Sequence, residues 1–417
     1  MTGTHTTADP APTDRTVPGR WGPLHQRNFR WLVTGATVNS LGGSITPVAL
    51  AFAVLDLGGS ATQLGMVVGA YALAEVLTTL FGGVLGDRLP RQVMMEGSSA
   101  ASALIQGFVA ASLIGHWSSV TLLALTGLLG GAVSALSGPS SSAMTPLTVP
   151  AEQLSAAISL RRLSSNAAMI VGFGLAGVLV ATIGSGWSIA IDAATYAVAA
   201  LCFSLLRVPQ VTAPDSESLL RGLRTGAAEV LRHTWLWLLI GQALLYHLFF
   251  GGAQAVLGPI VVGDAFGRAA WGWAMSALMV GFVAGGLVTL RWRPHRALLT
   301  GTVCLSLTAC FPLAMAWSPG VVGVLVGAFL HGLGLEIFSV WWDLSIQQSV
   351  PPEKLARVYS FDIVGSFVAR PLGLALVGPV SEAIGFHRWL VIVGAVMGGS
   401  SLLAACTSDV RRLVRRD

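Results

Sequence analysis

The 417-residue chain carries unusually little charge. Only 10% of its residues are Asp, Glu, Lys or Arg, whereas a soluble domain has roughly a quarter. With 53% hydrophobic residues and a mean hydropathy of +0.72, this deficit excludes an ordinary soluble enzyme and a disordered chain. Lysine is almost missing, since Lys354 is the only one among 24 basic residues. No basic run stands beside aromatic side chains, so we expect no nucleic-acid partner.

Cysteine is also scarce, and its placement excludes cysteine chemistry. The four cysteines all lie in apolar segments, and no CxxC pair occurs. We therefore expect neither a disulfide framework nor a metal site. The sequence also lacks a phosphate-binding loop, a Ser-His-Asp context and a metal-ligand cluster, so we expect no cofactor and no enzymatic activity.

What the chain has instead is a series of long apolar segments. A membrane-crossing helix needs roughly 20 mostly apolar residues, and His116-Trp117-Ser118-Ser119 or Gly184-Ser185-Gly186 divide the longest stretches. The sequence predicts an all-α polytopic membrane protein with twelve transmembrane helices. They span about 31–55, 62–86, 93–114, 119–145, 159–182, 187–206, 235–259, 270–291, 297–317, 320–345, 358–381 and 388–407.

The basic residues fall on one side of this topology. With both termini on the cytoplasmic side, the tail and the cytoplasmic loops hold 21 of the 24. Arg268 and Arg388 fall outside, and Arg370 lies within a span. This distribution predicts cytoplasmic termini in a multi-pass protein of the cell membrane. The preference for Arg over Lys, with abundant Ala and Gly, is typical of a GC-rich bacterium.

An internal repeat divides the chain. Residues 149–184 align without a gap to residues 350–385, with twelve of 36 positions identical. The identities include Gly172/Gly373, Gly177/Gly378 and Gly184/Gly385. Since these segments are a loop plus span five and a loop plus span eleven, we expect two pseudo-symmetric six-helix bundles in parallel orientation.

The predicted domain organisation follows from the repeat. A disordered cytoplasmic tail (1–28) precedes an N-terminal bundle (29–206), and a C-terminal bundle (235–408) precedes a basic cytoplasmic tail (409–417). The linker 207–234 places leucines on one face and arginines on the other over 216–232. We expect an amphipathic helix there, lying on the bilayer surface.

Two six-span halves match the architecture of the major facilitator superfamily, and a motif supports the resemblance. The loop after span two, Gly82–Gln92, reads GGVLGDRLPRQ. It resembles the superfamily's signature loop, G-x-x-x-D-R-x-G-R-R, at Gly83, Asp87, Arg88 and Arg91. The resemblance implies that Asp87 latches the halves together on the cytoplasmic side, where Arg88 or Arg91 would pair with Asp362. The alternative is that the loop serves only as a positively charged anchor on the cytoplasmic side.

A narrower resemblance concerns function. The segments VPAEQLSAAISL, IVGFGLAG and IDAATYAVAA are similar to the macrolide- and siderophore-exporter branch, although Phe173 stands where that branch usually has proline. This implies a secondary active, proton-coupled antiporter that exports small, largely apolar molecules, in which a monomer works within the lipid bilayer. Alternatives are a metabolite importer or uniporter on the same fold, or a membrane sensor that does not transport.

Charges inside the membrane are expensive, so each requires a role or a partner. Glu75 has no charged neighbour on its own span. It could carry the coupling proton or bind a cationic substrate, or it could be a protonated structural group. In span ten, Glu336 and Asp343 share one helical face with Gly332, Ser339 and Gln347. We expect this face to line the transport path, with Glu336 deep enough for coupling.

Arg370 remains protonated in any protein environment, so it requires a negatively charged partner within the membrane. Because spans ten and eleven are neighbours in sequence, we expect it to pair with Glu336. Asp192 lies one turn into span six, where we favour a structural role. The resemblance places spans one and seven at the centre of the molecule. It therefore implies a cavity lined by Asn39, Gln242, Tyr246, His247 and Gln254.

Overall fold

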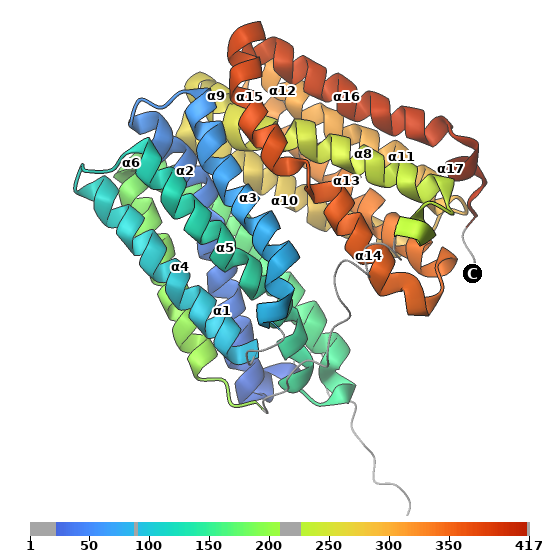
Figure 1. The fold of residues 1–417 in the computed structure, drawn as a ribbon, viewed down its shortest axis with the longest axis horizontal. Helices are drawn as coiled ribbons and strands as arrows, with labels where there is room; N and C mark the ends of the chain where they lie inside the picture. Colours follow the sequence, from blue (N-terminus) through green and yellow to red (C-terminus); the bar gives the residue numbers. More distant parts are fainter. Residues whose placement is uncertain (1–21, 87–90, 209–226, 415–417) are drawn as a thin grey trace, which may run out of the picture.

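The computed structural model describes residues 22–86, 91–208 and 227–414, and within these ranges it contains helices and no strand. The helices form two bundles (Figure 1). The first comprises α1 (Arg27–Gly43), α2 (Ile45–Asp56), α3 (Ala61–Gly86), α4 (Arg91–Ile114), α5 (Val120–Met144) and α6 (Leu154–Ser204). The second comprises α8 (Thr234–Gly252), α9 (Gly258–Phe266), α10 (Arg268–Arg291), α11 (Ala297–Leu305), α12 (Cys310–Trp317), α13 (Val321–Ser349), α14 (Pro352–Phe367), α15 (Arg370–Ile384) and α16 (Phe386–Cys406), followed by the short α17 (Ser408–Arg412).

The predicted twelve spans are confirmed. Ten helices or helix pairs of the described residues are long and apolar enough to cross a membrane, and Val120–Leu136 of α5 adds a shorter one. The twelfth arises because α6 is two spans joined at a non-helical residue, Gly184. Long apolar runs fold into helices here because a bilayer leaves every backbone polar group to be satisfied within its own segment.

Four spans are not continuous α-helices. Span nine is interrupted by a turn of 3-10 helix at Ser306–Ala309, between α11 and α12. Span one breaks at Ser44, between α1 and α2. Span seven contains a turn of π-helix at Ala253–Leu257, between α8 and α9. Span eleven breaks at residues 368–369, directly before Arg370 and Pro371 open α15. Proline suits the first turn of a helix and disrupts the interior, which accounts for the break in span eleven.

The two bundles meet at one end of the molecule and diverge toward the other (Figure 1). We call the end at which α1 begins and α16 finishes the terminal end, and the opposite end the distal end. At the distal end α2, α9 and α15 lie close together, whereas toward the terminal end α4 and α14 lie far apart (Figure 1). The structure is therefore closed between the bundles at its distal end.

The repeat is visible in the backbone. Gly184 and Gly385 occupy equivalent positions at the ends of spans five and eleven, and both have positive φ, +83° and +95°. Residues other than glycine rarely adopt this conformation, so each glycine allows a sharp reversal into the next span. The equivalence confirms that the two halves repeat one fold.

The other repeated glycines serve close helix packing. A Cβ on Gly172 would lie 2.5 Å from the Leu41 carbonyl oxygen of span one, and on Gly373 2.0 Å from the Leu248 carbonyl oxygen of span seven. These two contacts lie within the bundles. By contrast, Gly177 and Gly378 pack against backbone of the opposite bundle, at Ala269 and Thr62.

The predicted tails and linker lie partly outside the described residues. Of the amphipathic segment expected over 216–232, residues 227–232 are described, and 227–230 of these are helical. The domain boundaries drawn from the sequence stay predictions.

Candidate functional site

An ion pair between the two bundles occupies the break in span eleven. Arg370 is the first residue of α15, and its Nη1 atom lies 3.6 Å from Oε2 of Glu75 on α3. A cation at a helix N-terminus opposes the helix dipole, so the Glu75 carboxylate offsets an unfavourable position. The side chains are 38% and 32% exposed, which shows that the pair lies at an accessible surface between the bundles.

This contact corrects the pairing expected from the sequence. Glu336, the expected partner of Arg370, packs its Cβ against Gly285 of α10. The charge that attracts Glu336 is Arg162 of α6, in the opposite bundle. Sequence proximity of spans ten and eleven suggested the wrong carboxylate, because the pairing depends on how α3 and α15 pack.

Aromatic side chains flank the Glu75–Arg370 pair. Tyr71, one turn before Glu75 on α3, interacts electrostatically with both members of the pair and hydrogen bonds to Ser134 of α5. On the other side, His247 of α8 feels the charge of Arg370. Its ring lies 4.0 Å from the ring of Phe367, centroid to centroid. Aromatic side chains thus lie within electrostatic range of the pair from both bundles, Tyr71 in the first and His247 in the second.

The remaining candidates in span seven divide into two groups. Tyr246 hydrogen bonds through its hydroxyl to Nε2 of His331 at 2.7 Å, and His331 Nδ1 lies 2.8 Å from the Thr308 carbonyl oxygen. Gln242 is buried and donates to Ser401 Oγ at 3.1 Å. Tyr246 and Gln242 thus bind other helices of their own bundle. His331 is fully buried, and its lone position on an apolar helix gave no signal in the sequence.

The other two cavity candidates are half-buried. Gln254 lies within the π-helical turn of span seven and contacts Met275 Sδ from Nε2 at 3.4 Å. Asn39 lies in α1, about one turn from its end at Gly43. Of the five candidates predicted in spans one and seven, Tyr246 and His247 lie within electrostatic range of Arg370.

The polar face of span ten points to two different surroundings. Gly332 packs tightly against the Leu278 carbonyl oxygen of α10. Further along, Asp343 is exposed, and it accepts a hydrogen bond from Tyr359 of α14. Asp343 also feels the charge of Arg162. The polar face of span ten therefore packs against α10 at Gly332 and is exposed at Asp343, nearer the terminal end.

The predicted signature-loop latch is only partly described. Asp87 and Arg88 lie outside the described residues, while Gly83 falls within α3 and Arg91 begins α4. Asp362 accepts hydrogen bonds from Trp342 Nε1 at 3.1 Å and from Ser366 Oγ at 3.3 Å. These partners belong to its own bundle, so the pairing of Asp362 with Arg88 or Arg91 stays a prediction.

Two polar contacts that the sequence did not reveal join the bundles at the distal end. Arg268 Nη1 donates to Asp56 Oδ2 at 3.0 Å, and the guanidinium lies 5.2 Å from the centre of the Phe52 ring. Glu382 accepts from the backbone N–H of Thr62 at 3.0 Å and from its hydroxyl at 2.8 Å. A carboxylate suits this first turn of α3 because the helix dipole is positive there. We name these contacts the distal clasp.

The distal clasp explains an exception to the charge distribution. Arg268 is one of the basic residues that did not fit the one-sided pattern, and it is held by Asp56 at the opposite end of the molecule. An arginine on the unexpected side of a membrane protein was the available signal. Nothing in the sequence identified its partner, 212 residues away.

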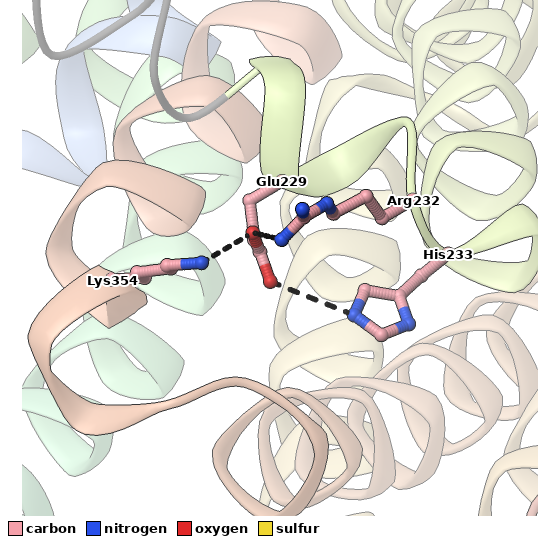
Figure 2. Close-up of polar contacts among 4 residues, drawn as sticks. All are labelled: Glu229, Arg232, His233 and Lys354. Carbon is pink, nitrogen blue, oxygen red and sulfur yellow. Dashed lines mark hydrogen bonds and ion pairs between the residues drawn. The ribbon is translucent and has the colours of Figure 1, made fainter.

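At the terminal end, a charge cluster ties the end of the linker to α14 (Figure 2). Lys354, the single lysine, donates from Nζ to Glu229 Oε2 at 2.8 Å, and Arg232 lies 3.3 Å from the same oxygen. His233 Nε2 lies 3.9 Å from Oε1 (Figure 2). The hydrogen bond from Lys354 holds the pKa of the Glu229 carboxyl below its usual range.

The described residues hold no group of three or more His, Cys, Asp or Glu that could bind a metal ion. The arrangement instead offers an accessible ion pair between two bundles that are closed at one end. Protonation of Glu75 would cancel its attraction to Arg370, which is a chemical means of changing the contact between α3 and α15.

Solved structures share this fold at low sequence identity. A POT family transporter in complex with thioalcohol conjugated peptide aligns with a TM-score of 0.71 and 14% identity, covering 93% of this chain and 96% of its own. A bacterial homolog of the human lysosomal transporter Spinster, in an inward-facing and unoccupied conformation, aligns with a TM-score of 0.65 and 15% identity over 90% and 96%.

Sequence similarity to bacterial efflux proteins extends over nearly the whole chain. The multidrug efflux pump Tap of Mycolicibacterium fortuitum is 28% identical over 409 residues, covering 94% of this chain and 97% of Tap. Macrolide efflux protein A of Streptococcus pyogenes is 23% identical over 402 residues, covering 92% and 97%. The family model described as Major Facilitator Superfamily matches residues 32–374. The chain is thus a multi-pass membrane protein that belongs to the Major Facilitator Superfamily.

Proposed function

We propose that this protein is a secondary active exporter of small, largely apolar molecules, and that it works as a proton antiporter by alternating access. Its similarity over nearly the full length to a multidrug efflux pump and a macrolide efflux protein supports the direction and the substrate class. The planar side chains around Arg370, among them His247, Phe367 and Tyr71, suit an apolar substrate with flat faces.

The observation that carries the proton coupling is the Glu75–Arg370 pair. It joins α3 to α15, so its strength bears on how the bundles contact each other. A proton on Glu75 removes the attraction, and loss of the proton restores it. Each transport cycle then exchanges one state of this contact for the other, with the substrate and the proton competing for the same accessible space.

The orientation belongs to the same proposal. The basic residues gather at the terminal end, which favours the cytoplasm for that side. The described state, closed at the distal clasp, would then be open to the cytoplasm and ready to load substrate. The signature loop with Asp87 would latch the terminal end in the opposite state. We further propose a monomer as the working unit and retain the two bundles, 29–206 and 235–408, as its domains.

The test is efflux from cells that express the protein. Cells loaded with ethidium or with the macrolide erythromycin should retain less of the compound, and a protonophore should abolish the difference. Glu75→Gln should abolish it as well while the protein remains in the membrane. The matched control is Glu152→Gln, at an exposed loop carboxylate, which should export normally. If expression does not change the retention of any compound in a broad panel, the exporter hypothesis is contradicted.

A further inference from the structure

A second carboxyl group, Asp192, is buried at the break in span one. Its side chain is fully buried on α6, and the Thr46 hydroxyl of α2 donates to its Oδ2 atom. A Cβ on Gly42, next to the break at Ser44, would lie 2.3 Å from Oδ1. Asp192 is therefore packed directly against the point where α1 passes into α2. The proposed mechanism does not yet use this group.

Hydrogen-bond accounting favours the protonated acid. The Thr195 hydroxyl lies 2.7 Å from the backbone carbonyl oxygen of Asp192 and 3.3 Å from its Oδ1. A hydroxyl has one proton to donate but two lone pairs. If Thr195 donates to the carbonyl, its oxygen is free to accept from a protonated Oδ1, and every group is satisfied. An ionised carboxylate would have two donors at most, Thr46 and, if its hydroxyl turns away from the carbonyl oxygen, the more distant Thr195, which is poor compensation for a buried charge.

The charge environment gives an ionised Asp192 no further compensation. Among the described residues, the titratable side chains in electrostatic range are Tyr196 on α6 and Tyr71 on α3, and both are neutral phenols. On the side of span one, the packed groups are the hydroxyl of Thr46 and the backbone at Gly42. Tyr71 is also the residue that interacts with Glu75 and Arg370. Tyr71 is therefore within electrostatic range of both carboxyl groups, Glu75 and Asp192.

We propose that Asp192, with Thr46 and Thr195, is a second proton-binding site, and that its proton leaves only when span one moves at its break. In the described state the acid has no access to water, so the proton is held. When the Gly42–Ser44 segment shifts, water reaches the carboxyl, the O–H bond breaks and the proton passes to water. The resulting carboxylate then accepts from Thr46 and from a rotated Thr195 hydroxyl. The inference rests on the proposed proton coupling and deepens it.

The direct test is infrared spectroscopy of the purified full-length protein. The difference spectrum between wild type and Asp192→Asn should contain the carbonyl band of a protonated carboxyl at neutral pH, and the band should fade as the pH is raised. Two results overturn the proposal: no such band at neutral pH, which means an ionised group, or a band that persists at every pH at which the protein stays folded.

Transport in proteoliposomes gives the second readout, with ethidium as the probe. Asp192→Asn fixes a neutral side chain of the same shape, so pH-gradient-driven accumulation should be lost while downhill exchange of ethidium remains. Asp264→Asn, at an exposed distal residue, is the matched control and should accumulate normally. Normal gradient-driven accumulation in Asp192→Asn overturns the inference. So does a result in which a Na⁺ gradient drives ethidium accumulation by wild type and Asp192→Asn no longer shows it, because the bound ion would then be Na⁺. If wild type itself accumulates no ethidium, the proposed function fails, and the infrared result still decides the protonation of Asp192.

Discussion

Substituting Gly272 with alanine should wedge the two bundles apart at the distal end. Gly272 lies on α10, and a Cβ there would stand 2.5 Å from the carbonyl oxygen of Phe173 and 2.7 Å from the backbone nitrogen of Gly177. Both neighbours are backbone atoms of α6 in the opposite bundle, so no flexible side chain can swing away. Ordinary van der Waals contact begins at 3.4 Å, and α10 must therefore retreat by about 0.9 Å.

The expected magnitude follows from the cost of overpacking. Forcing an extra carbon into a well-packed contact costs about 1–3 kcal/mol. The cost applies only while the bundles touch, because opening the distal end separates α10 from α6. A free-energy difference of about 1–3 kcal/mol shifts a two-state equilibrium about 5–150-fold. Gly272→Ala should therefore raise the population that is open at the distal end by that factor.

The assay is a distance measurement between spin labels on opposite bundles at the distal end. Labels on cysteines introduced at Ile183 and Val322, which are exposed, should move apart in Gly272→Ala. The four native cysteines are replaced first. The control is Gly107→Ala on α4, where a Cβ meets no atom within 4 Å. Both substitutions gain helix propensity, but only the first meets the opposite bundle. Identical distance distributions in the two variants would refute the prediction that the alanine side chain separates α10 from α6.

Three further perturbations test other contacts. Glu382→Gln weakens the exposed bonds to Thr62, so it should loosen the distal end about 2–5-fold, for a loss of roughly 0.5–1 kcal/mol, in the same spin-label experiment. Lys354→Gln should lower the melting temperature near pH 7. Because Lys354 depresses the pKa of Glu229, its stabilisation is present above the unfolded-state pKa, 4.5, and lost as the pH falls through the folded-state value, so the two melting temperatures should converge in acid. Arg370→Gln should abolish gradient-driven ethidium accumulation, and Arg370→Lys should restore part of it; equal loss in both variants would contradict a role for the charge.

The spans and the repeat could be predicted because their causes are local. A bilayer demands apolar length, and the positive φ at the equivalent positions Gly184 and Gly385 favours glycine at both. The break in span eleven was not predicted, although it has a local cause of the same kind in Pro371, which closely follows it. These features depend on the residues of one segment, so the sequence of that segment is sufficient to find them.

The pairings between bundles could not be predicted, because they depend on packing between distant segments. Arg370 was expected beside Glu336 and lies beside Glu75, 295 positions earlier in the chain, because α15 packs on α3. Arg268 looked like a stray charge until the structure placed it against Asp56. In each case the residue type signalled that a partner was needed, while the identity of the partner was fixed by the fold.

Proton movement measured together with substrate movement tests the account most directly. Purified protein is reconstituted into liposomes that enclose a pH indicator, a pH gradient is imposed, and ethidium accumulation is followed alongside the lumenal pH. Wild type should accumulate ethidium against its concentration gradient while protons flow the opposite way, and Glu75→Gln should do neither. Ethidium accumulation that proceeds without proton movement, or that Glu75→Gln leaves unchanged, would contradict proton coupling through Glu75.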